Sequence, residues 1–163
     1  MRWNLRIKIA NLTFFAMFTH TQTLEGVTSL EPDGRHIIMW DLEKCSLEQV
    51  KETLRKLQRK YCLSDIFVVS DIEGSYRAWC FSKIDFKTFL KILLETEFLD
   101  WNFFYYTVKR KKATLRTNNK KNRAPQRVVC ILKSYHVSFP SSCEKVVYDT
   151  GLAKRGLTIL LGG

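Results

Sequence analysis

The sequence has no acidic residue between Asp100 and Glu144, although that stretch contains ten lysines and arginines. The chain of 163 residues has 27 basic and 16 acidic residues. Without the ten basic residues of this stretch, 17 basic and 16 acidic residues remain. Almost all of the net charge of +11 therefore comes from one segment. Such a concentrated charge is typical of a surface that binds a polyanion, most commonly nucleic acid. A solvated basic segment with no specific ligand is the alternative.

Other absences narrow the protein class further. The five cysteines form no C-x-x-C pair and have no zinc-ligand spacing, which favours free thiols in a reducing compartment and a cytoplasmic protein. The apolar run at residues 9–18 is interrupted by Asn11 and Thr13 and is too short to cross a bilayer, so no membrane partner is expected. A hydrophobic content of 45% is enough for a folded core, and the length fits one domain.

The spacing of apolar residues predicts the order strand, helix, strand, strand, helix, strand, strand. This order predicts an α+β fold, with helices on one face of a mostly antiparallel sheet, a layout shared by RNA-recognition sheets and polymerase palms. We expect an N-terminal extension (1–35) that packs on the core and includes a loop at 19–35, a core domain (36–143) and a tail (144–163). Within the core the predicted elements are a strand at 36–43, a helix at 46–61 with a Ser46/Gln49 capping box, strands at 65–70 and 76–81, a helix from Ser82 and Asp85, a hairpin of 102–108 with 113–117 whose tip is 109–112, and a strand or short helix from Arg127 to His136.

Three acidic residues are candidate metal ligands. Asp41 and Glu43 lie two positions apart at the end of an apolar strand, so their side chains share one face of the sheet. Two carboxylates on one face suit a hard cation such as Mg²⁺ or Mn²⁺. Asp100 follows the second predicted helix and is the third candidate. The alternatives are a solvated strand end and an ordinary helix-end acid.

Two further segments contain candidate residues for binding the phosphates of a nucleotide or nucleic acid. The predicted hairpin of 65–81 places Ser70 at a strand end and Arg77 on the returning strand, and arginine is well suited to grip phosphate. Arg116 precedes a basic Asn/Lys loop, and the aromatic residues before it, Tyr105 among them, could stack on bases. Core packing of these aromatic residues is the alternative.

In this order, the segments resemble the archaeo-eukaryotic primase superfamily, in particular the small primases of plasmids and phages. Trp40-Asp41-Leu42-Glu43 is similar to the first motif of the family, and the hairpin Ser70 to Arg77 is similar to the second. Leu99-Asp100 is similar to the third. The resemblance implies an RNA-recognition-like palm domain over roughly residues 36–135. One departure is that Arg77 stands where the family has histidine, and arginine does not titrate near neutral pH.

The resemblance implies a nucleotidyltransferase that makes or extends primers on single-stranded DNA during replication of a mobile element. The expected cofactor is Mg²⁺ or Mn²⁺, and the expected partners are nucleoside triphosphates, a single-stranded DNA or RNA template and a helicase or another replication protein. A non-catalytic single-strand binder on the same fold is one alternative, and a structural or host-interaction protein is another. The predicted roles are catalysis and metal binding for Asp41, Glu43 and Asp100; nucleotide binding for Ser70, Arg77, Arg116 and Lys120; and nucleic-acid binding for Lys109, Arg110, Lys111, Lys112, Lys121, Arg123, Arg127 and Tyr105.

Overall fold

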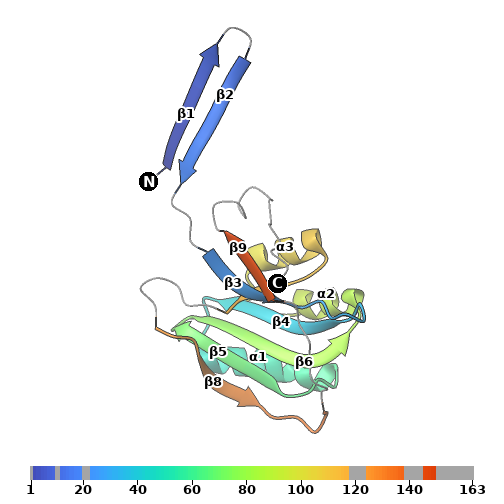
Figure 1. Ribbon diagram of the computed structural model, residues 1–163. Coiled ribbons are helices and arrows are strands. Elements are labelled where there is room, and N and C mark those ends of the chain that lie inside the picture. Colours follow the sequence, from blue (N-terminus) through green and yellow to red (C-terminus); the bar gives the residue numbers. More distant parts are fainter. Residues whose placement is uncertain (1, 10–11, 20–22, 118–123, 138–144, 150–163) are drawn as a thin grey trace. The chain divides into compact units, whose positions relative to one another are not determined.

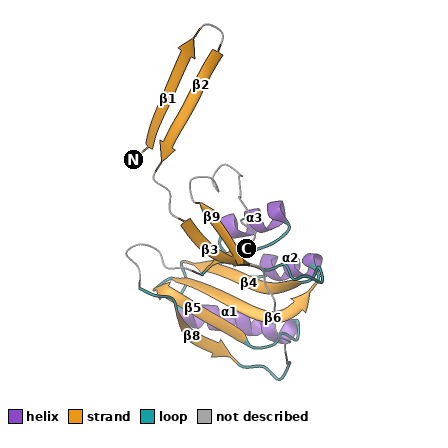
Figure 2. Cartoon of the chain, viewed as in Figure 1, coloured by secondary structure: helices purple, strands orange, loops and turns teal. Residues whose placement is uncertain are grey.

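The computed structural model describes residues 2–9, 12–19, 23–117, 124–137 and 145–149, and it confirms the α+β class (Figures 1 and 2). Two compact units divide the chain: Gly26–Lys145, and Met1–Glu25 together with Val146–Gly163. The elements are β1 (Arg2–Ile9), β2 (Leu12–Thr19), β3 (Thr23–Thr28), β4 (His36–Glu43), α1 (Leu47–Lys60), β5 (Ile66–Ile72), β6 (Ser75–Ile84), α2 (Phe86–Leu94), α3 (Trp101–Arg110), β7 (Thr114–Arg116), β8 (Arg127–Leu132) and β9 (Lys145–Asp149).

The largest sheet has four strands in the order β4-β6-β5-β8, and its neighbouring strands are antiparallel. Its strands thus follow one another as first, third, second and fourth in the sequence. The palm-like detail of the predicted fold stays a prediction. Strands β1 and β2 form an antiparallel hairpin, and the remaining sheet has the order β7-β3-β9.

Register explains which sheet residues are buried and which can reach a site. Trp40, Ala78 and Val68 pair across β4, β6 and β5, and all three are fully buried. Side chains alternate along a strand, so the next row, Asp41 with Arg77 and Val69, faces the opposite side. Met39, on the same face as Asp41, is also fully buried, so β4 is covered on both faces and Asp41 is the half-buried position near its end.

Helices α1 and α2 contribute apolar side chains to the same core. Helix α1 begins at the predicted capping box, in which the Ser46 hydroxyl accepts from the Gln49 N–H and the Gln49 side chain accepts from the Ser46 N–H. Helix α2 begins at Phe86 with the predicted Asp85 as its N-cap, whereas Ser82, also predicted at the helix start, belongs to β6. Figure 1 shows α1 behind β5 and β6. These two helices contribute Val50, Leu54, Leu57, Phe89, Ile92 and Leu93 to the core, and α3 adds Phe103.

Two sequence predictions are wrong. Residues 102–108 are not a strand of a hairpin: they belong to helix α3, which Asp100 caps by accepting the Asn102 N–H at 2.8 Å. The helix is favoured over a strand because its two buried side chains, Phe103 and Thr107, are four residues apart and share one helix face. The predicted loop at 19–35 contains strand β3, which pairs with β7 from Gly26 to Thr28.

Candidate active site

The candidate site lies near the C-terminal end of strand β4. Asp41 is one residue beyond the buried Trp40, and its side chain is 24% exposed. Across the ladder, the Arg77 Nε lies 4.0 Å from the Asp41 Oδ1, and only 9% of the Arg77 side chain is exposed. The buried guanidinium thus offsets the charge of a carboxylate that would otherwise be held next to an apolar core.

The segment 98–100 brings a second carboxylate to the same place. Phe98 has a left-handed backbone with a φ of 62°, which is unfavourable for a residue with a side chain. Its carbonyl accepts the Glu43 N–H at 2.9 Å, and the Asp100 N–H donates to the Asp41 carbonyl at 2.9 Å. Two backbone bonds to β4 therefore hold the strained turn and fix Asp100 beside Asp41.

Asp41 and Asp100 both line a cavity of about 210 Å³. The rest of its wall comes from one side of α3 and from the chain that follows the helix. These other lining residues are Asn102, Phe103, Tyr106, Thr107, Arg110, Lys112 and Thr114. The cavity therefore combines two carboxylates with two cationic side chains.

This donor set is chemically suited to a divalent cation together with a phosphate group. Asp100 Oδ1 caps α3 by accepting the Asn102 N–H, and the other carboxylate oxygen takes no part in that cap. Carboxylate oxygens are the preferred protein ligands of Mg²⁺ and Mn²⁺. Arg110 and Lys112 can bind phosphate oxygens, Arg110 through a planar fork and Lys112 as a point charge.

The third predicted ligand, Glu43, is separate from this pair. Its side chain is exposed, and the described residues that line the cavity do not include it. Within the described part of the chain, no group of three or more histidine, cysteine, aspartate or glutamate residues could hold a metal ion. The structure thus brings together two of the three predicted carboxylates, and the role of Glu43 stays a prediction.

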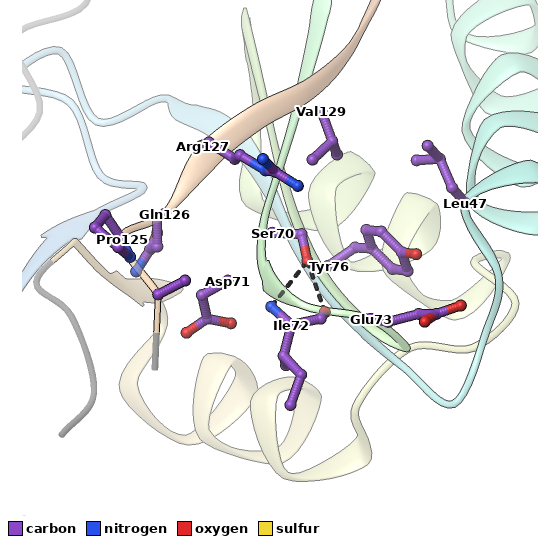
Figure 3. A pocket seen from close by; sticks show the side chains of 11 residues that line it. Leu47, Ser70, Asp71, Ile72, Glu73, Tyr76, Pro125, Gln126, Arg127 and Val129 are labelled. Carbon is purple, nitrogen blue, oxygen red and sulfur yellow. Dashed lines mark hydrogen bonds between the residues drawn. The ribbon is translucent and has the colours of Figure 1, made fainter. Parts of the chain in front are cut away.

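The predicted pair Ser70 and Arg77 is divided between two places. Ser70 lines a second cavity of about 560 Å³, at the turn of the β5–β6 hairpin (Figure 3). Its hydroxyl accepts from the Ile72 N–H and lies within hydrogen-bond distance of the carbonyls of Ile72 and Ser75, so it stabilises the turn. Arg127, which pairs with Ser70 in the sheet, also lines this cavity, with Asp71 and Glu73. Arg77 instead lies beside Asp41.

The remaining predicted residues lie on different elements. Tyr105, Lys109 and Arg110 belong to α3, Lys111 caps its C-terminal end, and Arg116 ends β7. Lys120, Lys121 and Arg123 lie outside the described residues. Sequence reasoning missed Asn102 and Tyr106 as cavity residues. Their spacing with Arg110, four residues at each step, would have indicated one face of a helix if residues 101–110 had been taken as helical.

The fold and this cavity together define an α+β protein with an acidic pair set among cations. Comparisons with protein-family models, with curated proteins and with solved structures found no match to this chain. Among the helices of the described residues, none is long and apolar enough to span a membrane.

Proposed function

We propose that this protein is a metal-dependent nucleotidyltransferase of the primase type, with its site at the cavity of Asp41 and Asp100. The observation that supports it is the meeting of these two acids, which lie far apart in the sequence and were both predicted as metal ligands. A template strand would bind to the basic segment that follows Asp100, and the particular use, primer synthesis on single-stranded DNA of a mobile element, follows from the resemblance of the motifs.

Each residue of the cavity has a defined part in this proposal. Asp41 and Asp100 would hold Mg²⁺ or Mn²⁺, which would supply charge stabilisation to the transferring phosphoryl group. Arg110 and Lys112 would neutralise the remaining phosphate oxygens of a nucleoside triphosphate. Arg77 would hold the Asp41 carboxylate in place beside the core, which is a positioning role.

A synthesis assay tests the proposal directly. Purified protein is incubated with single-stranded DNA, labelled nucleotides and Mg²⁺ or Mn²⁺, and the products are resolved on a denaturing gel. We expect products with the wild type and none with Asp41→Asn or Asp100→Asn. Asp71→Asn, which alters a carboxylate of the other cavity, is the matched control and should leave synthesis unchanged.

A non-catalytic single-strand binder is the second candidate, and one observation favours it: α3 exposes aromatic rings beside cations. It predicts tight oligonucleotide binding that needs no divalent metal and survives Asp41→Asn. Absence of synthesis by the wild type in both metals, combined with such binding, would replace the nucleotidyltransferase by the binder.

A further inference from the structure

The outward face of α3 has an unusual composition for a surface helix. Trp101 is 69% exposed and Tyr105 is 58% exposed, while Phe103 and Thr107 on the opposite side are buried. A solvated helix face normally carries charged and polar residues, because exposed aromatic rings forgo the stabilisation that burial would provide. Trp101, Tyr105 and Lys109 follow one another at intervals of four residues, so they form a continuous stripe.

Two tyrosine rings of this helix lie close to cations. The Lys109 Nζ lies 6.0 Å from the centre of the Tyr105 ring, and the Arg110 guanidinium carbon lies 5.0 Å from that of Tyr106. The two tyrosine rings also meet edge to face, with their centres 5.3 Å apart. Contacts of this kind restrict the rings before any ligand arrives, which lowers the entropy lost on binding.

Charge identifies the class of ligand. Helix α3 contains no acidic residue, and Lys109, Arg110, Lys111 and Lys112 follow one another at its C-terminal end. Cations there are favourable for the helix dipole, which explains their position. The dipole does not explain the exposed rings. A protein surface with both flat apolar rings and positive charge is suited to single-stranded nucleic acid, because the bases stack on the rings and the phosphates pair with the cations.

We infer that the stripe of Trp101, Tyr105 and Lys109 is a stacking platform for single-stranded nucleic acid, with bases on the two rings and the phosphate backbone at Lys109 and its basic neighbours. Trp101 matches none of the motifs that led to the other candidate residues. The neighbouring side of the same helix, with Asn102, Tyr106 and Arg110, lines the cavity of Asp41 and Asp100. One helix would thus hold the strand on one side and face the acidic pair with the other. This inference extends the proposed function by naming the template surface, but it does not need catalysis.

The test measures binding in EDTA and without nucleotides, so that it is independent of synthesis. Affinities for a labelled twelve-nucleotide oligodeoxyadenylate, its RNA counterpart and a fully abasic oligomer of the same length are measured by fluorescence anisotropy. Trp101→Ala and Tyr105→Ala should each weaken binding of the intact oligomers by about 5- to 100-fold. Neither variant should change binding of the abasic oligomer, which keeps the phosphates and lacks the bases.

Tyr135→Ala is the matched control, because Tyr135 is a fully exposed tyrosine beyond strand β8. It should bind every oligomer like the wild type, and circular dichroism should show that all variants are folded. An equal loss for intact and abasic oligomers, or no loss for either, would overturn the inference. If the variants lose affinity only for the intact oligomers and the wild type makes no products, the platform is retained and the nucleotidyltransferase is rejected. If the wild type makes products and the variants lose no affinity, the nucleotidyltransferase is retained and the platform is rejected.

Discussion

Helices α1 and α3 both expose one long side to solvent, yet they treat their charges differently. On α1, the lysines are paired with acids one turn away, Lys51 with Glu48 at 2.7 Å and Lys56 with Glu52 at 2.9 Å. On α3, the cations lie over tyrosine rings, and the helix has no acid of its own. Lys51 and Lys56 are therefore neutralised within α1, although that helix has five basic and two acidic residues in all, whereas Lys109 and Arg110 have no acidic partner on α3.

The comparison also separates two roles for a helix cap. Ser46 caps α1 and does not line the cavity of Asp41 and Asp100. Asp100 caps α3 and also lines that cavity. A substitution of Ser46 should therefore change stability only through the strength of the helix cap. At Asp100, the capping role and the proposed catalytic role can be tested separately, because asparagine caps a helix about as well as aspartate.

The largest expected effect is on synthesis by Asp100→Asn. The variant should keep the stability of the wild type, since the cap remains, but lose more than about 100-fold in the rate of nucleotide incorporation, because a metal ligand is removed. The rate is measured on primed single-stranded DNA, and the unfolding midpoint is measured in urea. A variant that is stable and still active would show that Asp100 only caps α3.

The matched substitution on α1 is Ser46→Ala. It should lower the free energy of unfolding by about 1 kcal/mol, as Asp100→Ala should on α3, with synthesis affected only by the second. Urea unfolding compares the two losses. If Ser46→Ala reduced synthesis as strongly as Asp100→Ala, loss of stability would be a sufficient explanation for both.

Salt dependence of oligonucleotide binding should distinguish the two helices next. Removing two phosphate contacts with Lys109→Ala and Arg110→Ala should make the slope of log K against log salt shallower by about 1.4 for a single strand. The corresponding pair on α1, Lys51→Ala and Lys56→Ala, should leave the slope unchanged, because those lysines are neutralised by Glu48 and Glu52. Equal changes for the two pairs would mean that only the overall charge matters.

The parts of this protein that sequence could predict are those set by local chemistry. The capping box of α1 and the strand that carries Asp41 depend on residues within a few positions of one another, and both are confirmed. Residues 102–108 were misread because a run of phenylalanine and tyrosine has a high β propensity, which tertiary packing of Phe103 overrode. The capping role of Asp100 was the local signal for a helix.

The meeting of Asp41 and Asp100 depends on contacts that no spacing rule reveals. It needs the left-handed Phe98 and two backbone hydrogen bonds to β4, which only the folded chain supplies. Sequence reasoning proposed both acids by resemblance to known motifs, but it also expected Ser70 with Arg77 in one place. The register of β4 and β6 places Arg77 beside Asp41 instead, while the Ser70 hydroxyl bonds within its own turn.

Stability against pH should depend on a region outside both helices. His36 is buried between Phe86 and Phe89, and its Nδ1 lies 3.0 Å from the Ser29 hydroxyl. That hydroxyl also accepts from the Ala113 N–H, so His36 lies in a buried hydrogen-bonded cluster. Burial lowers the pKa of His36 below its usual 6.5, and nearby Asp85 opposes part of this shift.

A lowered pKa in the folded state means that the unfolded chain binds the proton more tightly. The stability due to neutral His36 is therefore complete above pH 6.5 and falls as the pH drops through 6.5 towards the folded pKa. Urea midpoints between pH 5 and pH 8 measure it. His136→Gln, an exposed control, should keep this pH dependence, and His36→Gln should remove it. If His36→Gln retained the wild-type profile, another group would be responsible.

The smallest expected effect comes from removing the two acids of α1, so that this helix, like α3, has no acidic residue. Glu48→Gln with Glu52→Gln releases Lys51 and Lys56 from their acidic partners and leaves the helix without aromatic neighbours for them. Exposed ion pairs of this kind contribute little, so the unfolding midpoint should barely change. Oligonucleotide affinity should rise less than about twofold at physiological salt, where isolated surface charges are largely screened. A gain as large as the loss from the two α3 substitutions would show that positive charge is sufficient and that the rings of Trp101 and Tyr105 are not needed.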